Sequence, residues 1–158
     1  MSSRERNDVD SPWYIAIRDW LRIDVFNREF PDHDDYWDCN WLNARWRVHN
    51  DISRAEWSGP YIRTDELERL AELVPELRVG KVETVRLAPT EGWWDLEVSK
   101  SGELGHFDLR VVVSALNASP GRFRSHHTFE FIVEHADLQL AEAQLQSVLQ
   151  EFPVIGKP

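Results

Sequence analysis

The residue types best suited to chemistry are concentrated in residues 30–48, which read FPDHDDYWDCNWLNARWRV. This segment holds four aspartates, three tryptophans, one histidine and the only cysteine of the chain. Aspartate, histidine and cysteine bind metals or exchange protons, whereas tryptophan is favoured at binding interfaces. Three interpretations are open: a catalytic or metal site, a binding face, or an acidic turn that leads into a tryptophan-rich strand.

The spacing of these residues argues against a metal site. His33, Asp34, Asp35, Asp38 and Cys39 are near neighbours in one predicted loop. They lack the paired cysteines or the spaced histidines of a zinc site, and the alternating acids and glycine of a calcium loop. We therefore expect no bound metal and no cofactor.

Candidate catalytic groups elsewhere in the chain are isolated. His106 and Asp108 share one face of a predicted strand, but no serine or cysteine in a nucleophile motif completes a triad. His126 and His127 point to opposite faces of a strand and cannot hold one ion together. Cys39 is expected to be a small buried residue. The chain is therefore expected not to be an enzyme.

The chain is strongly acidic, with 18 basic against 28 acidic residues and a formal net charge of -10. Such a field repels phosphate backbones and anionic lipid surfaces and attracts basic partners. Binding to nucleic acid or membranes is therefore disfavoured, although a local basic patch remains possible at RFRSHH, residues 122–127. The charge serves either solubility alone or an acidic face for a basic protein.

Length and composition predict one domain. The 158 residues contain 42% hydrophobic residues, which is ordinary for a globular protein. Residues 1–12 are polar and predict a flexible tail, so the globular domain spans 13–158. The tail lacks the apolar centre of a secretory signal, and no apolar run is long enough to span a membrane. A single cysteine excludes an internal disulfide, which fits a cytoplasmic protein.

Apolar residues alternate with polar ones in several segments, and this periodicity predicts strands. The first segment reads as one strand with an interruption near Asp19, and the third has a break or bulge at Gly59-Pro60. Short turns at residues 100–103 and 116–122 separate the last strands. The predicted strands cover residues 13–26, 40–49, 54–62, 81–88, 93–99, 104–115 and 123–135.

Two segments show helical spacing instead. Thr64 is the expected N-cap of the first helix, which Pro75 should end or distort near Val74. Asp137 is the expected N-cap of a final helix that stops at Pro153. The predicted fold class is α+β, predominantly β. We expect an antiparallel sheet of about six or seven strands with one connecting helix and one C-terminal helix.

All eight tryptophans lie between Trp13 and Trp94. Trp46, Trp57 and Trp94 fall on the apolar faces of their strands and are expected in the core. Trp37 and Trp41 flank the acidic turn, where each ring either pins the loop to the sheet or anchors a partner.

Residues 34–48, DDYWDCNWLNARWRV, resemble the N-terminal signature of the WapI-type immunity proteins and their uncharacterised bacterial relatives. That signature runs Asp-Tyr-Trp-Asp-Gly-Asn-Trp-Leu and enters a strand. Cys39 stands where glycine is usual. The family's order of elements also fits, with a helix near the middle, a block of strands and a final helix ending in Phe152-Pro153. The matching positions are Asp35, Tyr36, Trp37, Asp38, Asn40, Trp41 and Leu42.

The resemblance implies a small cytoplasmic bacterial protein that binds and neutralises the C-terminal domain of a polymorphic toxin. A basic toxin domain is the expected partner, because an acidic chain complements it electrostatically. The alternative is a non-enzymatic binding module for a carbohydrate or a small-molecule ligand, since exposed tryptophans suit sugar rings. Asp38 is also a candidate to cap the turn. The expected partner-binding residues are Asp34, Asp35, Trp37, Asp38 and Trp41.

Overall fold

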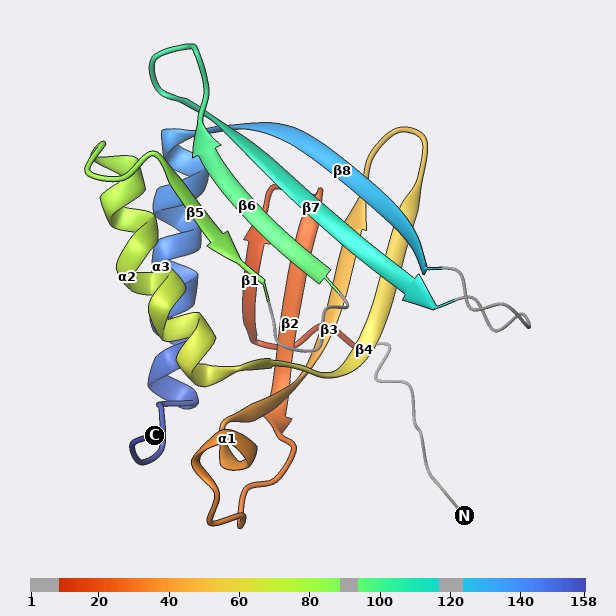
Figure 1. The fold of residues 1–158 in the computed structure, drawn as a ribbon, viewed down its shortest axis with the longest axis vertical. Coiled ribbons are helices and arrows are strands. Elements are labelled where there is room, and N and C mark those ends of the chain that lie inside the picture. The colour runs from red at the N-terminus through yellow and green to blue at the C-terminus, as the bar shows by residue number, and fades with distance from the viewer. Residues whose placement is uncertain (1–8, 89–93, 117–123) are drawn as a thin grey trace.

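The computed structural model describes residues 9–88, 94–116 and 124–158. In these residues eight strands form two four-stranded antiparallel sheets, ordered β1-β2-β3-β4 and β5-β6-β7-β8 (Figure 1). The first sheet contains β1 (Trp13–Ile17), β2 (Leu21–Arg28), β3 (Trp41–His49) and β4 (Arg54–Arg63). The second contains β5 (Thr84–Leu87), β6 (Trp94–Lys100), β7 (His106–Leu116) and β8 (Arg124–Glu134).

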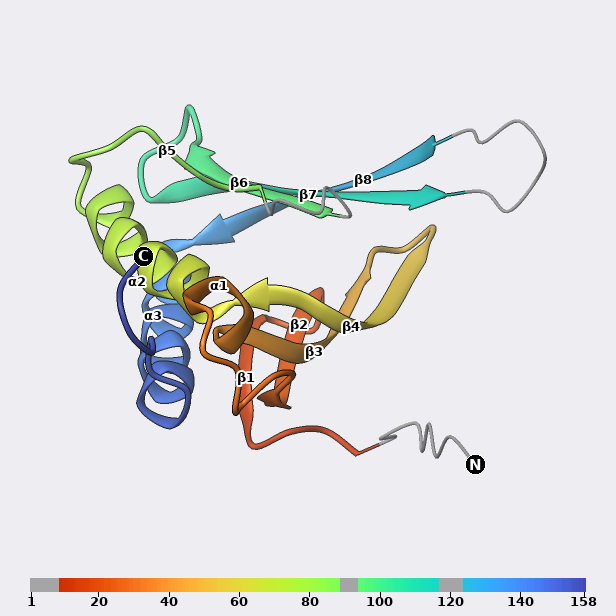
Figure 2. The ribbon, with the colours of Figure 1, turned by 60° about the horizontal axis from the view of Figure 1, so that its bottom comes forward.

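The sheets lie in two layers, and the long helices α2 (Thr64–Arg78) and α3 (His135–Glu151) lie along one side of both (Figure 2). The short helix α1 (Tyr36–Cys39) lies between β2 and β3. The α+β, predominantly β class is thus confirmed, but the strands number eight and divide into two sheets. No helix in the described residues is long and apolar enough to cross a membrane.

The predicted strand at residues 13–26 is a hairpin of β1 and β2, and the interruption predicted near Asp19 is the turn between them. The chain reverses at Arg18, whose φ is 49°, and the N–H of Trp20 donates to the carbonyl of Ile17 at 3.1 Å. Ile17 and Leu21 then pair across β1 and β2. Paired residues point to the same face of a sheet. The apolar alternation therefore continues through the turn, so the sequence pattern does not show that the chain reverses there.

Stacked tryptophans connect the two sheets in the core. The ring centre of Trp46 lies 3.9 Å from that of Trp94 and 5.5 Å from that of Trp57. Trp46 and Trp94 are buried, as predicted, and Trp57 is partly buried at the margin of the core. The bulge predicted near Gly59-Pro60 is present as a register shift between β3 and β4. Residues 117–123, which include most of the predicted turn at 116–122, lie outside the described part.

The N-caps of the two long helices lie one and three residues before the predicted Thr64 and Asp137. Arg63 is the N-cap of α2, and Glu134 is the N-cap of α3. Asp137 lies within the first turn, where its carboxylate accepts the backbone N–H of Glu134 at 2.8 Å. Helix α2 also continues past Pro75 to Arg78, so of the two predicted effects of Pro75, an end near Val74 is wrong. Leu77 is fully buried and holds this last turn against the core.

The segment before β1 is attached to the first sheet. Ser11 is buried, its N–H donates to Asp24 at 3.0 Å, and its hydroxyl donates to the carbonyl of Val25. Residues 1–8, the greater part of the predicted tail, lie outside the described residues.

Candidate functional site

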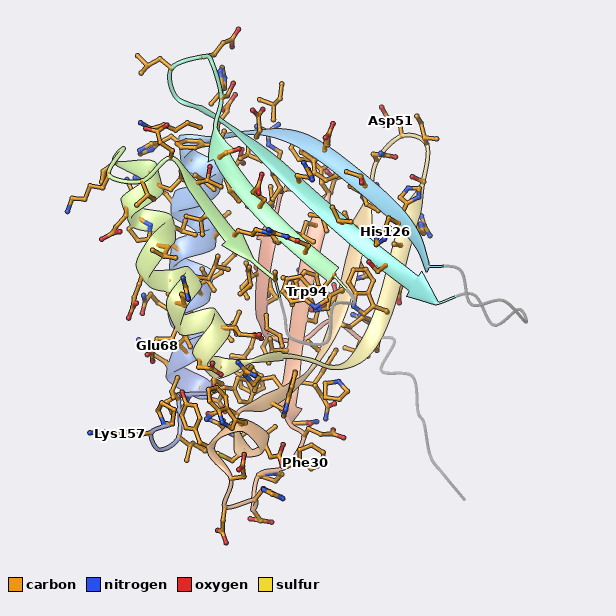
Figure 3. All side chains as sticks on the ribbon, in the orientation of Figure 1. Phe30, Asp51, Glu68, Trp94, His126 and Lys157 are labelled. Atoms are coloured by element: carbon orange, nitrogen blue, oxygen red, sulfur yellow. The ribbon has the colours of Figure 1, made fainter. Side chains whose placement is uncertain are left out.

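Residues 30–40, called the acidic loop below, lie at one end of the molecule and contain α1 (Figure 1). The loop connects the end of β2 to the start of β3. Its charged side chains project outward, and the nearby end of α2 carries further acids such as Glu68 (Figure 3). The exposed or half-exposed aspartates of the loop are Asp32, Asp34, Asp35 and Asp38.

Asp35 fixes the local conformation of the acidic loop. It is the N-cap of α1, and its Oδ1 accepts the backbone N–H groups of Trp37 at 2.9 Å and Asp38 at 3.2 Å. An aspartate satisfies otherwise unpaired N–H groups at this position. The cap is therefore Asp35 and not Asp38. The carboxylate of Asp38 instead lies 3.6 Å from Nδ1 of His33.

Asn40 attaches the acidic loop to two distant parts of the chain. Its side chain is fully buried, and its Oδ1 accepts the hydroxyl of Thr64 at 2.6 Å and the N–H of Ile155 at 2.9 Å. Its Nδ2 donates to the carbonyls of Tyr36 at 2.7 Å and Ile155 at 3.1 Å. The loop is thus held between the start of α2 and the C-terminal segment. Sequence reasoning missed this role, although Asn40 lies within the quoted motif.

Cys39 is the last residue of α1 and is buried, as predicted. Its backbone is outside the left-handed region that favours glycine. The loop conformation therefore does not require the glycine that is usual at this position of the motif.

Trp37 and Trp41 both lie near one guanidinium group, that of Arg63. The Cζ of Arg63 lies 4.8 Å from the ring centre of Trp37 and 5.5 Å from that of Trp41. Arg63 is itself fixed by Asp65, which accepts its Nε at 3.0 Å. Trp37 is 47% exposed, whereas Trp41 is partly buried. The indole of Trp37 is thus exposed to solvent while it contacts an arginine that Asp65 holds in place.

The other tryptophans in the described part are at least partly buried, so Trp37 alone is exposed there. The described residues therefore form no strip of several exposed indoles of the kind that suits a sugar chain. The second exposed aromatic ring of the loop is Phe30, whose centre lies 6.2 Å from that of His33.

Acidic groups from α2 strengthen the negative field around the loop. The pKa of the Tyr36 hydroxyl is raised, first because the hydroxyl loses contact with water, and then because Asp65 and Glu68 lie nearby. A phenolate is disfavoured by both effects. The acidic surface therefore extends from the aspartates of the loop to the first turns of α2.

The histidines that were catalytic candidates in the sequence are each paired with a nearby side chain. His106 lies 2.9 Å from a carboxylate oxygen of Glu103, while Asp108 is exposed. His126 is hydrogen bonded to the hydroxyl of Ser114, and His127 to that of Ser53, so the two rings point to different neighbours. No group of three or more potential metal ligands occurs among the described residues. The predicted basic patch at 122–127 lies partly outside them.

Comparison with known protein families assigns the chain to a family of immunity proteins. A family model described as the immunity protein WapI-like family matches residues 15–153. Since the match spans most of the chain, the protein belongs to the WapI-like immunity protein family, and the resemblance stated from the sequence is confirmed. Among curated proteins, none matches the sequence significantly.

Proposed function

We propose that the chain is an immunity protein that acts in the cytoplasm by binding the C-terminal domain of a polymorphic toxin and neutralising it. Membership of the WapI-like family supports an immunity function. The proposed mechanism is occlusion by binding, and it requires no catalytic residue and no metal.

The acidic loop is the proposed contact face. Asp34, Asp35 and Asp38 supply negative charge, and Trp37 supplies an apolar anchor that is 47% exposed. Trp41 is partly buried, and its ring lies near the same arginine, Arg63, as the ring of Trp37. Tryptophan surrounded by polar groups is frequent among the residues that dominate binding energy. The observation that carries the proposal is this single exposed indole on an acidic loop.

The loop is also organised before binding. Asp35 caps α1, and Asn40 attaches the loop to Thr64 and Ile155 through buried hydrogen bonds. A pre-ordered loop loses less conformational entropy when a partner binds. The negative field would additionally accelerate encounter with a basic toxin domain.

Co-expression with the toxic domain encoded beside this chain tests the proposal. We expect cells that produce the toxic domain to survive with the chain and to die with an empty vector. A Trp37→Ala variant should protect less well than an Ile52→Ala variant, because Ile52 is also an exposed apolar residue but lies on a different loop, between β3 and β4. Equal lethality with and without the chain would contradict the immunity function. Equal protection by both variants would contradict the proposed face alone.

A further inference from the structure

The outer face of the first sheet carries an unusual concentration of arginine. Arg22 of β2 is paired directly with Arg47 of β3, and Arg45 is paired with Asp24 in the next row. Like charges directly opposite each other on neighbouring strands are destabilising. This face therefore requires anionic groups to compensate the guanidinium groups.

Asp24 supplies the first compensating carboxylate. It is fully buried and accepts Nε of Arg22 at 3.0 Å and Nη2 of Arg47 at 3.0 Å, with Nη2 of Arg45 at 3.4 Å. One carboxylate thus serves three guanidinium groups.

Asp10 supplies a second carboxylate from the segment before β1. Its Oδ1 accepts Nη2 of Arg47 at 2.7 Å and Nη2 of Arg45 at 2.9 Å, and its Oδ2 lies 3.9 Å from Arg22. The hydrogen bond from Arg47 is the largest cause that lowers the pKa of Asp10. The side chain is nevertheless 53% exposed. A carboxylate is therefore bound by this cluster at a position that solvent and other molecules reach.

A depression of about 500 Å³, called the arginine pocket below, opens beside Asp10. Its volume falls within the range of small-ligand sites, about 300–1,000 Å³. Its lining contains four arginines and three carboxylates, so its formal charge is 4 − 3 = +1, against -10 for the whole chain. The arginines are Arg18, Arg22, Arg47 and Arg54, and the carboxylates are Asp10, Asp19 and Glu56.

Two of these arginines differ in whether a carboxylate already binds their guanidinium group. Arg18 is held by Asp137 of α3 at 3.1 Å. Arg54 is exposed on β4, and its side chain makes no hydrogen bond or ion pair within the described part of the chain. Arg54 is therefore the guanidinium group that a second carboxylate would meet first at the rim of the pocket.

We infer that the arginine pocket is a second binding site, which takes an acidic side chain of a protein partner. The incoming carboxylate replaces that of Asp10 on Arg47 and gains a further contact with Arg54. Guanidinium groups match the planar shape of a carboxylate and bind it through paired hydrogen bonds. The occupied position of Asp10 shows the geometry that such a group would adopt.

The arginine pocket and the acidic loop lie at opposite ends of the first sheet. Asp51, between β3 and β4, and Phe30, in the acidic loop, mark these two ends (Figure 3). The two sites can therefore be tested separately. The arginine pocket can fail to bind while the acidic loop binds its partner, and the acidic loop can fail while the pocket binds. A partner that engages both ends needs basic groups at one position and an acidic group at the other.

Titration with a blocked tetraglutamate peptide, followed by NMR of the backbone amide and arginine Nε–H groups, tests the inference. We expect saturable shifts confined to the segment around Asp10, the β1–β2 turn and the β3–β4 hairpin. Arg54→Gln should weaken binding about fivefold, the effect of one exposed ion pair. Arg86→Gln is the control. Arg86 is an exposed arginine on the second sheet, where it is paired with Asp95. It should leave the affinity unchanged.

The variant Asp10→Asn separates competition from general charge attraction. We expect Asp10→Asn to increase the affinity for the peptide. Asp108→Asn removes one negative charge at a remote site, and it should increase the affinity less. Unsaturable shifts, equal weakening by Arg54→Gln and Arg86→Gln, or equal effects of Asp10→Asn and Asp108→Asn would each overturn the inference. Inorganic phosphate that displaces the peptide at equal concentration would overturn the assignment to an acidic protein segment and indicate a general oxyanion site.

Discussion

Asn40 and Ile155 are hydrogen bonded in both directions, with the N–H of Ile155 donating to Asn40 at 2.9 Å and Asn40 donating to the carbonyl of Ile155 at 3.1 Å. Together with Thr64, this pair holds the C-terminal segment, the acidic loop and the start of α2 at one point. The local order of the loop thus depends on residues far away in the sequence.

Replacing Asn40 by alanine should therefore be strongly destabilising. The change leaves the buried hydroxyl of Thr64 and the partly buried backbone groups of Ile155 without their partner. We expect a loss of about 3 kcal/mol in the free energy of unfolding, measured by urea denaturation. Asn43→Ala is the control, because Asn43 is only partly buried and donates to the exposed side chain of Asn27 and the partly buried one of Glu29. A similar loss for both variants would show that the burial of Asn40 has no special effect.

Asp35 offers a test of the cap within the acidic loop. Asp35→Ala removes the acceptor for the N–H groups of Trp37 and Asp38 and should cost about 1 kcal/mol of stability. Asp35→Asn should cost only a few tenths, because asparagine caps about as well as aspartate. Chemical denaturation measures both. If the two variants lose equal stability, charge and not capping accounts for the contribution of Asp35.

The strand faces of this protein could be predicted from sequence because alternation directly reports which side chains point inward. The apolar faces of β1, β2 and β3 were assigned correctly for this reason, as Ile15, Ile23 and Trp46 illustrate. An interruption near Asp19 was predicted, but the reversal of the chain there was missed because Ile17 and Leu21 pair across the turn and preserve the alternation. The division into two sheets depends on contacts between distant segments, which alternation does not report.

The helix caps were mispredicted for a different physical reason. Strand β4 ends at Arg63 and α2 begins at the next residue, and β8 passes into α3 in the same way at Glu134. No turn residue separates strand from helix, so the cap is the last extended residue, whatever its side chain. Asn40 was missed because its partners, Thr64 and Ile155, are distant in sequence. The motif identified the loop, but only the fold shows what holds it.

Glu66 should make stability depend on pH. Burial is the largest cause that raises its pKa, although the backbone N–H of Arg63 partly offsets this. The folded protein therefore holds this proton more tightly than the unfolded chain. The stability contributed by the bound proton is full below the usual glutamate pKa, about 4.3, and is lost as pH rises through the raised pKa.

A Glu66→Gln variant should remove that dependence. Glutamine still accepts the N–H of Arg63, since glutamate and glutamine serve equally in this position of a capping box. We expect a flatter profile of unfolding free energy between about pH 4 and pH 7, measured by urea denaturation at several pH values. Glu68→Gln, on the exposed face of the same helix, should leave the profile unchanged. An unaltered profile for Glu66→Gln would contradict the assignment.

Trp37 should dominate the affinity for the toxin domain. Removing its exposed ring by Trp37→Ala is expected to weaken binding by about 2 kcal/mol, or about 30-fold, as for a central interface residue. The melting temperature should change little, because almost half of the ring already faces water. Calorimetric titration measures the affinity. The exposed residue Ile52 provides the control variant Ile52→Ala, and equal weakening by both would exclude Trp37 as the anchor.

Electrostatic attraction by the acidic loop should appear in the rate of association with a basic toxin domain. The Debye length shortens from about 30 Å at 0.01 M salt to about 8 Å at 0.15 M, so association should slow as salt increases. The double variant Asp34→Asn with Asp38→Asn keeps the side-chain shapes, leaves the Asp35 cap in place and removes two charges. Its association should be slower at low salt and less sensitive to salt, as measured by stopped-flow fluorescence. The double variant Asp51→Asn with Asp108→Asn makes the same change in net charge on other parts of the surface, where both residues are exposed. If this control slows association equally, the overall charge of the chain attracts the partner, and the acidic loop has no particular part in the encounter.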